Sequence, residues 1–306
     1  MQRPHLLHIF SPTKHVSPFD INMAYEARFD AVIPYCNVEL GEVHGLTQDT
    51  IFSRSREGVR RTGIFIGGRD FDLALKMAET ARAAMVPPFA VSVMADPSGA
   101  ITTAAAMVAL TEHWLARTAG GDLSGRRVCI YGGTGPVGMC TALLVARCGA
   151  ECTIVSTQGR GAAQLAAERI GRAHGVTIRG ADGASQDAMR EWLPTVDVMF
   201  SAAKAGVEVV TTETLGAATN LLVAADANAV PPSGIAGVAA NDKGRALKLA
   251  NGRDVCALGA LAIGDIKYKV HTALLQQMYE TDTPVYLAHD EAFATARDIV
   301  AQQKKA

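Results

Sequence analysis

The feature that most constrains this chain is a glycine-rich turn between a strand-like segment, residues 125–130, and a helix-like segment, residues 141–150. The turn has the spacing Gly-x-Gly-x-x-Gly. In this pattern the first glycine allows a tight turn, the second lets a pyrophosphate approach the backbone, and the third lets the helix lie close to the sheet. The N-terminus of the helix offers free N–H groups and a partial positive charge to an anion. We therefore predict that a dinucleotide is bound by Gly133, Thr134, Gly135, Pro136, Val137 and Gly138.

The end of the following strand indicates which dinucleotide is bound. An NAD site commonly carries Asp or Glu there, on the ribose 2′-hydroxyl. Residues 154–160 contain no carboxylate, whereas Ser156, Thr157 and Arg160 suit a 2′-phosphate. NADP is therefore the expected cofactor, and use of NAD as well is the next possibility. Arg160 has an alternative interpretation as a solvated loop arginine.

The segments around the turn predict the fold class. Strand-like segments at 127–132, 151–156, 196–202 and 220–226 alternate with alanine-rich helical stretches. This alternation is typical of a parallel sheet covered by helices on both faces. Ser201, Ala202, Asp226 and Asn228 lie at or just after strand ends, at the sheet edge where ligands bind in this architecture, and we expect them in the cofactor site.

The N-terminal part also alternates strands and helices, and one helix is predicted to have Ser17 as N-cap and Pro18 at its first position. A segment rich in Gly, Ser and Asp near residue 120 predicts a boundary. We expect an α/β protein of two domains. These are an N-terminal α/β substrate domain at 1–120 and a Rossmann-type domain at 121–268. Helices within 269–306 are expected to pack on the first domain, and the active site is expected in the cleft between the two.

Composition argues against several other classes of protein. The 29 basic and 30 acidic residues give a net charge of −1, which disfavours nucleic acid or an acidic membrane surface as a partner. No apolar run is long enough to span a bilayer and no signal-peptide layout is present, so a cytoplasmic protein is expected. The six cysteines form no CxxC pair and the eight histidines form no HxxxH pair, so no metal site is expected.

Four further stretches are more specific than the glycine pattern. They read HVSPFDINMA at 15–24, ADPSGAITTAAAMVA at 95–109, DANAVPPSGIAG at 226–237 and LGALAIGDIKYK at 258–269. In order, over nearly the whole chain, they resemble the bacterial NAD(P)-dependent methylene-tetrahydromethanopterin dehydrogenases, which are related to the methylene-tetrahydrofolate dehydrogenases. The resemblance implies a homo-oligomeric enzyme of one-carbon (formaldehyde) metabolism. It would transfer hydride from the carbon bridge between two pterin nitrogens of tetrahydromethanopterin to the nicotinamide, leaving a methenyl cation.

The resemblance also implies a catalytic lysine, which corresponds to Lys267. We expect Lys267 in the first turn of a helix that Gly264 and Asp265 open. A buried lysine can orient a substrate carbonyl or nitrogen, and because the product is cationic this role is favoured over that of a base. Lys269 is expected to face elsewhere on the helix. The alternative is that both are ordinary lysines of an amphipathic helix.

Asp20, Thr102 and Thr103 are the expected substrate-binding residues. Each has an alternative interpretation as a helix cap, since Ser17 and Asp20 have the spacing of a capping box and the threonines begin a helix. Two alternative functions also remain. One is a methylene-tetrahydrofolate dehydrogenase, and the other is an NADP-binding sensor without turnover.

Overall fold

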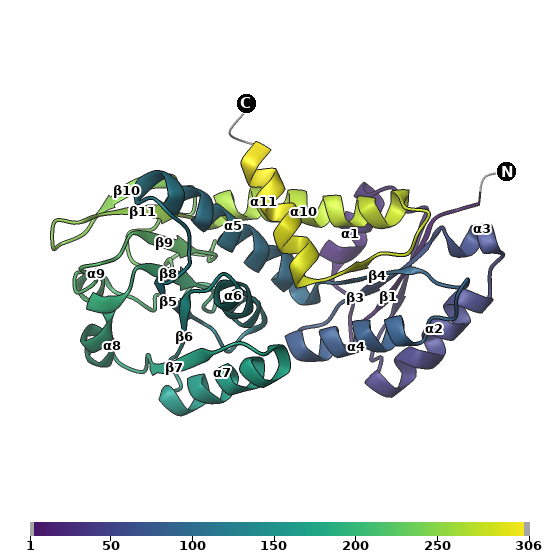
Figure 1. Cartoon of the computed structure of the whole chain (residues 1–306), viewed down its shortest axis with the longest axis horizontal. Helices are drawn as coiled ribbons and strands as arrows, with labels where there is room; N and C mark the ends of the chain where they lie inside the picture. The colour runs from purple at the N-terminus through teal and green to yellow at the C-terminus, as the bar shows by residue number, and fades with distance from the viewer. Residues whose placement is uncertain (1–2, 303–306) are drawn as a thin grey trace. The chain divides into compact units, whose positions relative to one another are not determined.

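A computed structural model describes residues 3–302 of the chain (Figure 1). The described residues form two compact units, one of residues 3–102 and 268–295 and the other of residues 103–267 and 296–302. Each unit boundary falls inside a helix: α5 (Ala100–Thr118), α10 (Ala260–Glu280) and α11 (His289–Gln302). Among the helices of residues 3–302, none is both long and apolar enough to cross a bilayer.

The first unit contains a five-stranded parallel sheet in the order β12-β4-β3-β1-β2. Its strands are β1 (Leu6–Phe10), β2 (Ala31–Tyr35), β3 (Thr62–Ile66), β4 (Ser92–Ala95) and β12 (Tyr286–Leu287). All five residues of β3 are buried, as expected for a central parallel strand with both faces covered.

Helices surround this sheet. They are α1 (Pro18–Glu26), α2 (Val43–Phe52), α3 (Arg56–Val59) and α4 (Phe71–Ala83), with short 3₁₀ turns η1 (Leu40–Glu42) and η2 (Pro97–Gly99). The predicted start of α1 is confirmed, because Ser17 is the N-cap and Pro18 the first helical residue. The Ser17 hydroxyl accepts from the amide of Phe19, 3.2 Å away.

The second unit contains a seven-stranded sheet in the order β10-β11-β9-β8-β5-β6-β7. Its strands are β5 (Arg127–Tyr131), β6 (Glu151–Ser156), β7 (Ile178–Asp182), β8 (Val198–Ser201), β9 (Val223–Asp226), β10 (Lys243–Lys248) and β11 (Asp254–Leu258). All neighbouring pairs are parallel except β10 and β11, which pair antiparallel. This is the predicted Rossmann-type parallel sheet with one antiparallel edge strand.

Helices connect these strands in the way the alternation predicts. They are α6 (Pro136–Arg147), α7 (Arg160–His174), α8 (Gln186–Trp192) and α9 (Thr212–Leu215), with the 3₁₀ turn η3 (Leu193–Thr195). Helix α6 packs on β5 and β6, and α7 packs on β6 and β7. Met189 and Leu193 of the α8–η3 segment pack with Cys129 and Tyr131 of β5 in a common apolar core.

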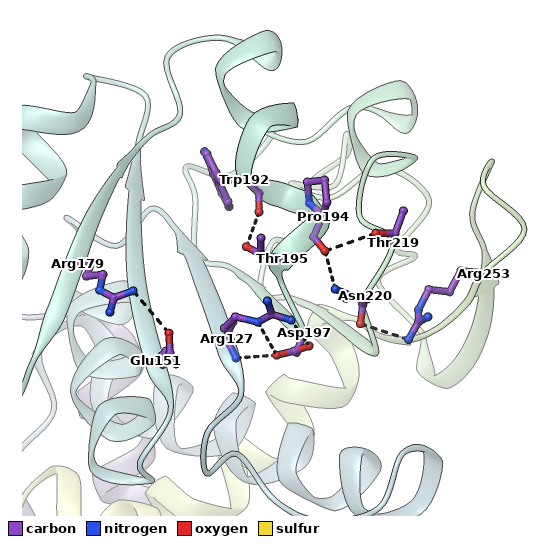
Figure 2. Close-up of polar contacts among 10 residues, drawn as sticks. All are labelled: Arg127, Glu151, Arg179, Trp192, Pro194, Thr195, Asp197, Thr219, Asn220 and Arg253. Atoms are coloured by element: carbon purple, nitrogen blue, oxygen red, sulfur yellow. Dashed lines mark hydrogen bonds and ion pairs between the residues drawn. The ribbon is translucent and has the colours of Figure 1, made fainter.

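A row of alternating charges marks the beginning of the parallel strands (Figure 2). Arg127 pairs with Asp197, which precedes β8, at 3.3 Å, and Arg179 of β7 pairs with Glu151 of β6 at 3.6 Å. The row lies at the opposite edge of the sheet from the glycine turn, because the turn follows the carboxyl end of β5. These ion pairs connect neighbouring strands at their amino ends. In this architecture ligands bind at the carboxyl ends of the strands.

Two details of the sequence prediction were wrong or incomplete. The last long helix begins at Ala260 and not at Asp265, so Lys267 is its eighth residue and does not lie in its first turn. Gly264 and Asp265 resemble a helix start, but Ala260, Leu261 and Ala262 are good helix formers and extend the helix towards the N-terminus. Strands β7, β10 and β12 were not predicted.

Candidate functional site

The glycine turn joins β5 to α6 and has little space for side chains. Gly132 has a φ of +71°, in the left-handed region that favours glycine. A Cβ atom on Gly132 would overlap the backbone carbonyl of Ala202. The sequence pattern assigned the tight turn to Gly133, whereas the structure places the left-handed residue one position earlier. Gly133 itself lies inside the tight turn, which the amide of Gly135 closes by donating to the Gly132 carbonyl at 3.0 Å.

Gly133 and Gly138 are required by close packing. A Cβ atom on Gly133 would overlap the side chain of Ile154 in β6. A Cβ atom on Gly138 would overlap the carbonyl oxygen of Gly132 and the Cα atom of Gly133. Helix α6 therefore lies directly against the turn, as the third glycine of the pattern predicts.

The N-terminus of α6 has the properties of an anion site. Gly135 is its N-cap residue, no side chain caps the helix, and Pro136 occupies a position where a missing N–H costs nothing. A Cβ atom on Gly135 would lie 3.4 Å from the carbonyl of Gly132, so the turn is open on this side. Amide groups of the first turn, with the helix dipole, can receive a phosphate there.

A cavity of about 360 Å³ adjoins this turn. Five of the residues predicted to bind the cofactor line it, namely Thr134, Gly135, Ser156, Thr157 and Ala202. Tyr131 also lines it, and burial raises the pKa of the Tyr131 phenol well above its ordinary value. The glycine turn, the end of β6 and the loop after β8 therefore surround one cavity, which suits a dinucleotide phosphate.

Hydroxyl groups at the end of β6 and a lysine after β8 make part of the cavity lining polar and positively charged. Ser156 is buried and its hydroxyl accepts from the amide of Gln158, 3.1 Å away, while Thr157 is exposed. Lys204, which follows β8 and also lines the cavity, was not predicted. Its place just after a buried parallel strand was the signal that could have identified it.

Arg160 is the first residue of α7, and it lines a different cavity, of about 580 Å³. This larger cavity is lined by residues at the charged beginnings of β5 and β6 and by Trp192 of α8. Arg160 is exposed. The described structure therefore does not bring Arg160 into the lining of the cavity at the glycine turn.

The predicted polar residues at the ends of β8 and β9 form a buried network. Ser201 and Asp226 are in register on the two strands. Asp226 accepts from the amides of Asn228 at 3.0 Å and Ile235 at 2.9 Å. Burial raises the pKa of the Asp226 carboxyl, while these hydrogen bonds oppose the shift. The Asn228 side chain donates to the carbonyl of Pro232 at 3.0 Å.

This network organises the loop after β9. A Cβ atom on Gly234 would overlap the Ser201 hydroxyl, so the loop is packed closely on the strand ends. Ser201, Asp226 and Asn228 are not among the residues that line the cavity at the glycine turn.

Lys267 lies half-buried on α10, whereas Lys269 is exposed. The buried face of this helix includes Ile263, Ile266 and Val270, so Lys267 lies beside that face and Lys269 lies on the other side. The two lysines therefore lie on different sides of α10, as the sequence predicts.

The predicted substrate residues occupy two helix starts. Asp20 is the third residue of α1 and is 4% exposed. Thr102, near the start of α5, is completely buried and donates to Asp96 at 2.7 Å, while Thr103 is half-buried. Thr102 therefore faces the protein interior, and Thr103 is the more accessible of the two threonines.

Known proteins resemble this chain over most of its length. The family described as methylene-tetrahydromethanopterin dehydrogenase, N-terminal, matches residues 18–98. An NAD(P)-dependent methylenetetrahydromethanopterin dehydrogenase of Methylorubrum extorquens is 42% identical over 294 residues, which cover 96% of this chain and 98% of that protein. The bifunctional protein MdtA of the same organism is 32% identical over the same shares of the two chains.

A solved structure extends the likeness of fold. The NAD-dependent malic enzyme of Thermotoga maritima has a TM-score of 0.56 and 12% identity, and the match covers 97% of this chain and 85% of that chain. At this identity the likeness concerns the fold alone. The sequence identity to the first M. extorquens relative is much higher and runs through both units. The chain therefore belongs to the family of NAD(P)-dependent methylenetetrahydromethanopterin dehydrogenases.

Proposed function

We propose that this protein oxidises methylene-tetrahydromethanopterin to methenyl-tetrahydromethanopterin, with NADP as the hydride acceptor. One observation carries the proposal. The 42% identity to a relative of that name covers 96% of the chain, so it includes both the glycine turn and the unit that lacks it. We assign the nicotinamide cofactor to the unit of residues 103–267 and 296–302. We assign the pterin to Asp20 of the other unit, with Thr103 and Lys267, the first and last residues of the segment 103–267, and with Thr102 as a supporting residue.

The residues at the glycine turn fit a dinucleotide. A Cβ atom at Gly132, Gly133 or Gly138 would overlap neighbouring protein atoms, so the turn can keep this tight conformation only with glycine at these positions. Thr134 and the first turn of α6 would hold the pyrophosphate, with Pro136 and Val137 providing the backbone of that turn. When bound, the cofactor supplies the C4 atom of its nicotinamide ring as hydride acceptor. Ala202 lines the same cavity. Ser201, Asp226 and Asn228 would hold the adjoining strand ends in place, since Asp226 accepts from the amides of Asn228 and Ile235.

NADP is the preferred cofactor in this proposal, with NAD as a second acceptor. No carboxylate ends β6, where Ser156 and Thr157 line the cavity instead. The exposed Lys204 adds a positive charge to the same cavity. Arg160, the exposed first residue of α7, is proposed as a further partner of the 2′-phosphate. Basic and hydroxyl groups favour a phosphate over the 2′-hydroxyl of NAD.

The chain's own groups on the pterin side position the substrate. Lys267 would donate a hydrogen bond to a carbonyl or ring nitrogen of the pterin, and would not act as a base, because the product is a cation. Asp20 is buried and offers a carboxylate to the pterin N–H groups, and Thr103 offers a hydroxyl. Thr102 would not contact the pterin itself, and would hold the Asp96 carboxylate in place by donating a hydrogen bond to it. Such positioning supplies most of what a hydride transfer needs from the protein.

Location, assembly and metabolic role belong to the same proposal. We expect a homo-oligomer that works in the cytoplasm on one-carbon units at the oxidation level of formaldehyde. None of the six cysteines forms a disulfide within the described residues, which suits a reducing compartment.

The decisive experiment is a spectrophotometric assay at the reduced-nicotinamide band. Purified protein is given methylene-tetrahydromethanopterin or methylene-tetrahydrofolate, each with NADP and with NAD. Rapid reduction of NADP with the methanopterin supports the proposal. Turnover with the folate alone would make the chain a methylene-tetrahydrofolate dehydrogenase. NADPH binding without turnover of either substrate would favour the sensor.

A further inference from the structure

A buried carboxylate, that of Asp96, lies in the unit of residues 3–102 and 268–295. Asp96 follows β4 and is completely buried. Its Oδ1 atom accepts from the amides of Ile101 at 2.8 Å and Thr102 at 3.2 Å, which cap the N-terminus of α5. Its Oδ2 atom accepts from the Thr102 hydroxyl at 2.7 Å and lies 2.9 Å from Nδ1 of His271. The helix N-terminus and these donors favour the ionised form.

His271 of α10 joins this network through one ring nitrogen. Because Asp96 is a carboxylate that accepts from its other partners, Nδ1 of His271 carries the proton and donates. The imidazole is completely buried, and its Nε2 atom has no hydrogen-bond partner among the described residues. The rings of Phe19 and Phe65 surround it, with centroids 5.5 and 5.8 Å away.

This arrangement is poorly explained by stability alone. A buried polar atom without a partner keeps its full desolvation penalty, and an apolar side chain of similar size can replace a buried polar pair with little loss. The network is better explained by the geometry that it fixes. Its hydrogen bonds determine the direction of the imidazole, and therefore the rotation of α10 about its own axis.

The network connects the three segments that carry the proposed substrate residues. His271 is four residues after Lys267, and residues at this spacing lie on the same face of a helix. Asp96 caps the first turn of α5, which carries Thr103. The Phe19 ring, which packs edge-on against His271, immediately precedes Asp20 in α1.

We propose that Asp96, Thr102 and His271 are positioning residues, which hold α10 and the first turn of α5 in the orientation that hydride transfer requires. This inference rests on the proposed function. The residues act through Lys267 and Thr103, and none of the three contacts the reacting atoms. A small error in the placement of such groups is costly, because a displacement of about 1 Å can slow a positioned reaction by about 10²-fold.

The test compares variants that differ by one hydrogen bond. His271→Leu removes the donor to Asp96, whereas His271→Asn keeps an N–H at the position of Nδ1. Thr102→Val removes the hydroxyl and Thr102→Ser keeps it. Thr50→Val is the matched control, because Thr50 is 5% exposed and its hydroxyl donates to the carbonyl of Leu46 within α2, outside this network. Each variant is assayed for kcat per folded enzyme, for the isotope effect with deuterated methylene substrate, and for NADPH affinity.

We expect His271→Leu and Thr102→Val to lower kcat by about tenfold or more and to raise the isotope effect, because the transfer step becomes slower. NADPH affinity should not change, and His271→Asn and Thr102→Ser should recover most of the loss. Thr50→Val should change the melting temperature without changing the isotope effect.

Equal kcat values for His271→Leu and the wild type would overturn the inference. Equal losses of kcat in His271→Leu and His271→Asn would also overturn it. So would a loss of kcat in Thr50→Val that matches those of the network variants at the same decrease in melting temperature. If His271→Leu does not fold, the kcat values of Thr102→Val and Thr102→Ser are compared instead. Equal values for these two variants would overturn the inference. A wild-type protein that oxidises no methylene-tetrahydromethanopterin would refute the proposed function itself, and the wild-type arm of the assay reports this separately.

Discussion

Lys267 is the residue on which the proposed chemistry depends most. Replacing it with Met keeps much of its apolar stem but removes the ammonium group that we expect to orient the pterin. We predict a fall in kcat of about 10²-fold or more, with NADPH affinity unchanged, because one positioned polar group commonly contributes that much. Stopped-flow measurement of nicotinamide reduction and a fluorescence titration with NADPH check the two parts.

The control for this prediction is two residues away. Lys269 carries the same charge on the same helix but is exposed. Lys269→Met should therefore keep the wild-type kcat. A similar loss in both variants would indicate that the charge of the helix matters and not the placement of Lys267.

Cys148 provides a pH-dependent prediction at the same scale. Burial and the nearby Glu112 carboxylate raise the pKa of the Cys148 thiol to about 12. The thiolate is the reactive form, so at pH 8 only about one part in ten thousand of Cys148 can react. Its alkylation should be slow and should rise about tenfold for each pH unit up to that pKa.

The exposed Cys36 serves as the internal comparison in this experiment. Peptide mass spectrometry after timed treatment with iodoacetamide should find Cys36 modified well before Cys148. Glu112→Gln removes the neighbouring charge and should make Cys148 react faster. A Cys148 rate that equals the Cys36 rate at pH 8 would contradict the prediction.

At the scale of an element, we expect the glycine turn and α6 to bind the cofactor together. Gly138→Ala would force the helix away from the turn, because the added atom would overlap the backbone of Gly132 and Gly133. We expect a loss of about 1–3 kcal/mol in the free energy of unfolding and weaker NADP binding. Gly45→Ala in α2 is the control, because its added atom meets nothing within 4 Å and should stabilise the helix slightly. Thermal melts with and without NADP measure both effects.

How much of each element the sequence predicts depends on where its stabilising contacts lie. The glycine turn is local, because its spacing and its flanking strand and helix fall within about 20 residues of sequence. Strand β7 was missed because its first residue, Ile178, is its only large apolar side chain. It is instead tied to α7, where the Gln164 side chain accepts from the Gly180 amide at 3.0 Å. That contact appears only after the helix is placed.

The same argument explains which site residues could be found. Gly133, Gly135 and Gly138 follow a recognisable spacing, and Lys267 came from a family resemblance over a continuous stretch. Asp96 and His271 are 175 positions apart, and their hydrogen bond exists only because the second half of α10 packs in the first unit. No periodicity or local motif identifies such a pair.

At the scale of the whole chain, a long-range ion pair connects the last helix, α11, to α5 within the second unit. Arg297 of α11 donates to both carboxylate oxygens of Glu112 in α5, at 2.8 and 2.7 Å, across 185 positions of sequence. The arginine side chain is 50% exposed but that of Glu112 is only 16% exposed. Arg297→Met therefore leaves a mostly buried carboxylate without this partner, and we expect a loss of about 1–2 kcal/mol in the free energy of unfolding.

A double-mutant cycle with Glu112→Gln separates this ion pair from the packing of the two side chains. If the pair itself stabilises the unit, the double variant should be no less stable than Arg297→Met, because the unpaired charge has been removed. In a chain of this size the single loss corresponds to a decrease of roughly 2–3 °C in the melting temperature. Strictly additive losses in the cycle would show that α11 is held by its apolar face, and that the ion pair contributes nothing to closing the end of the chain onto the second unit.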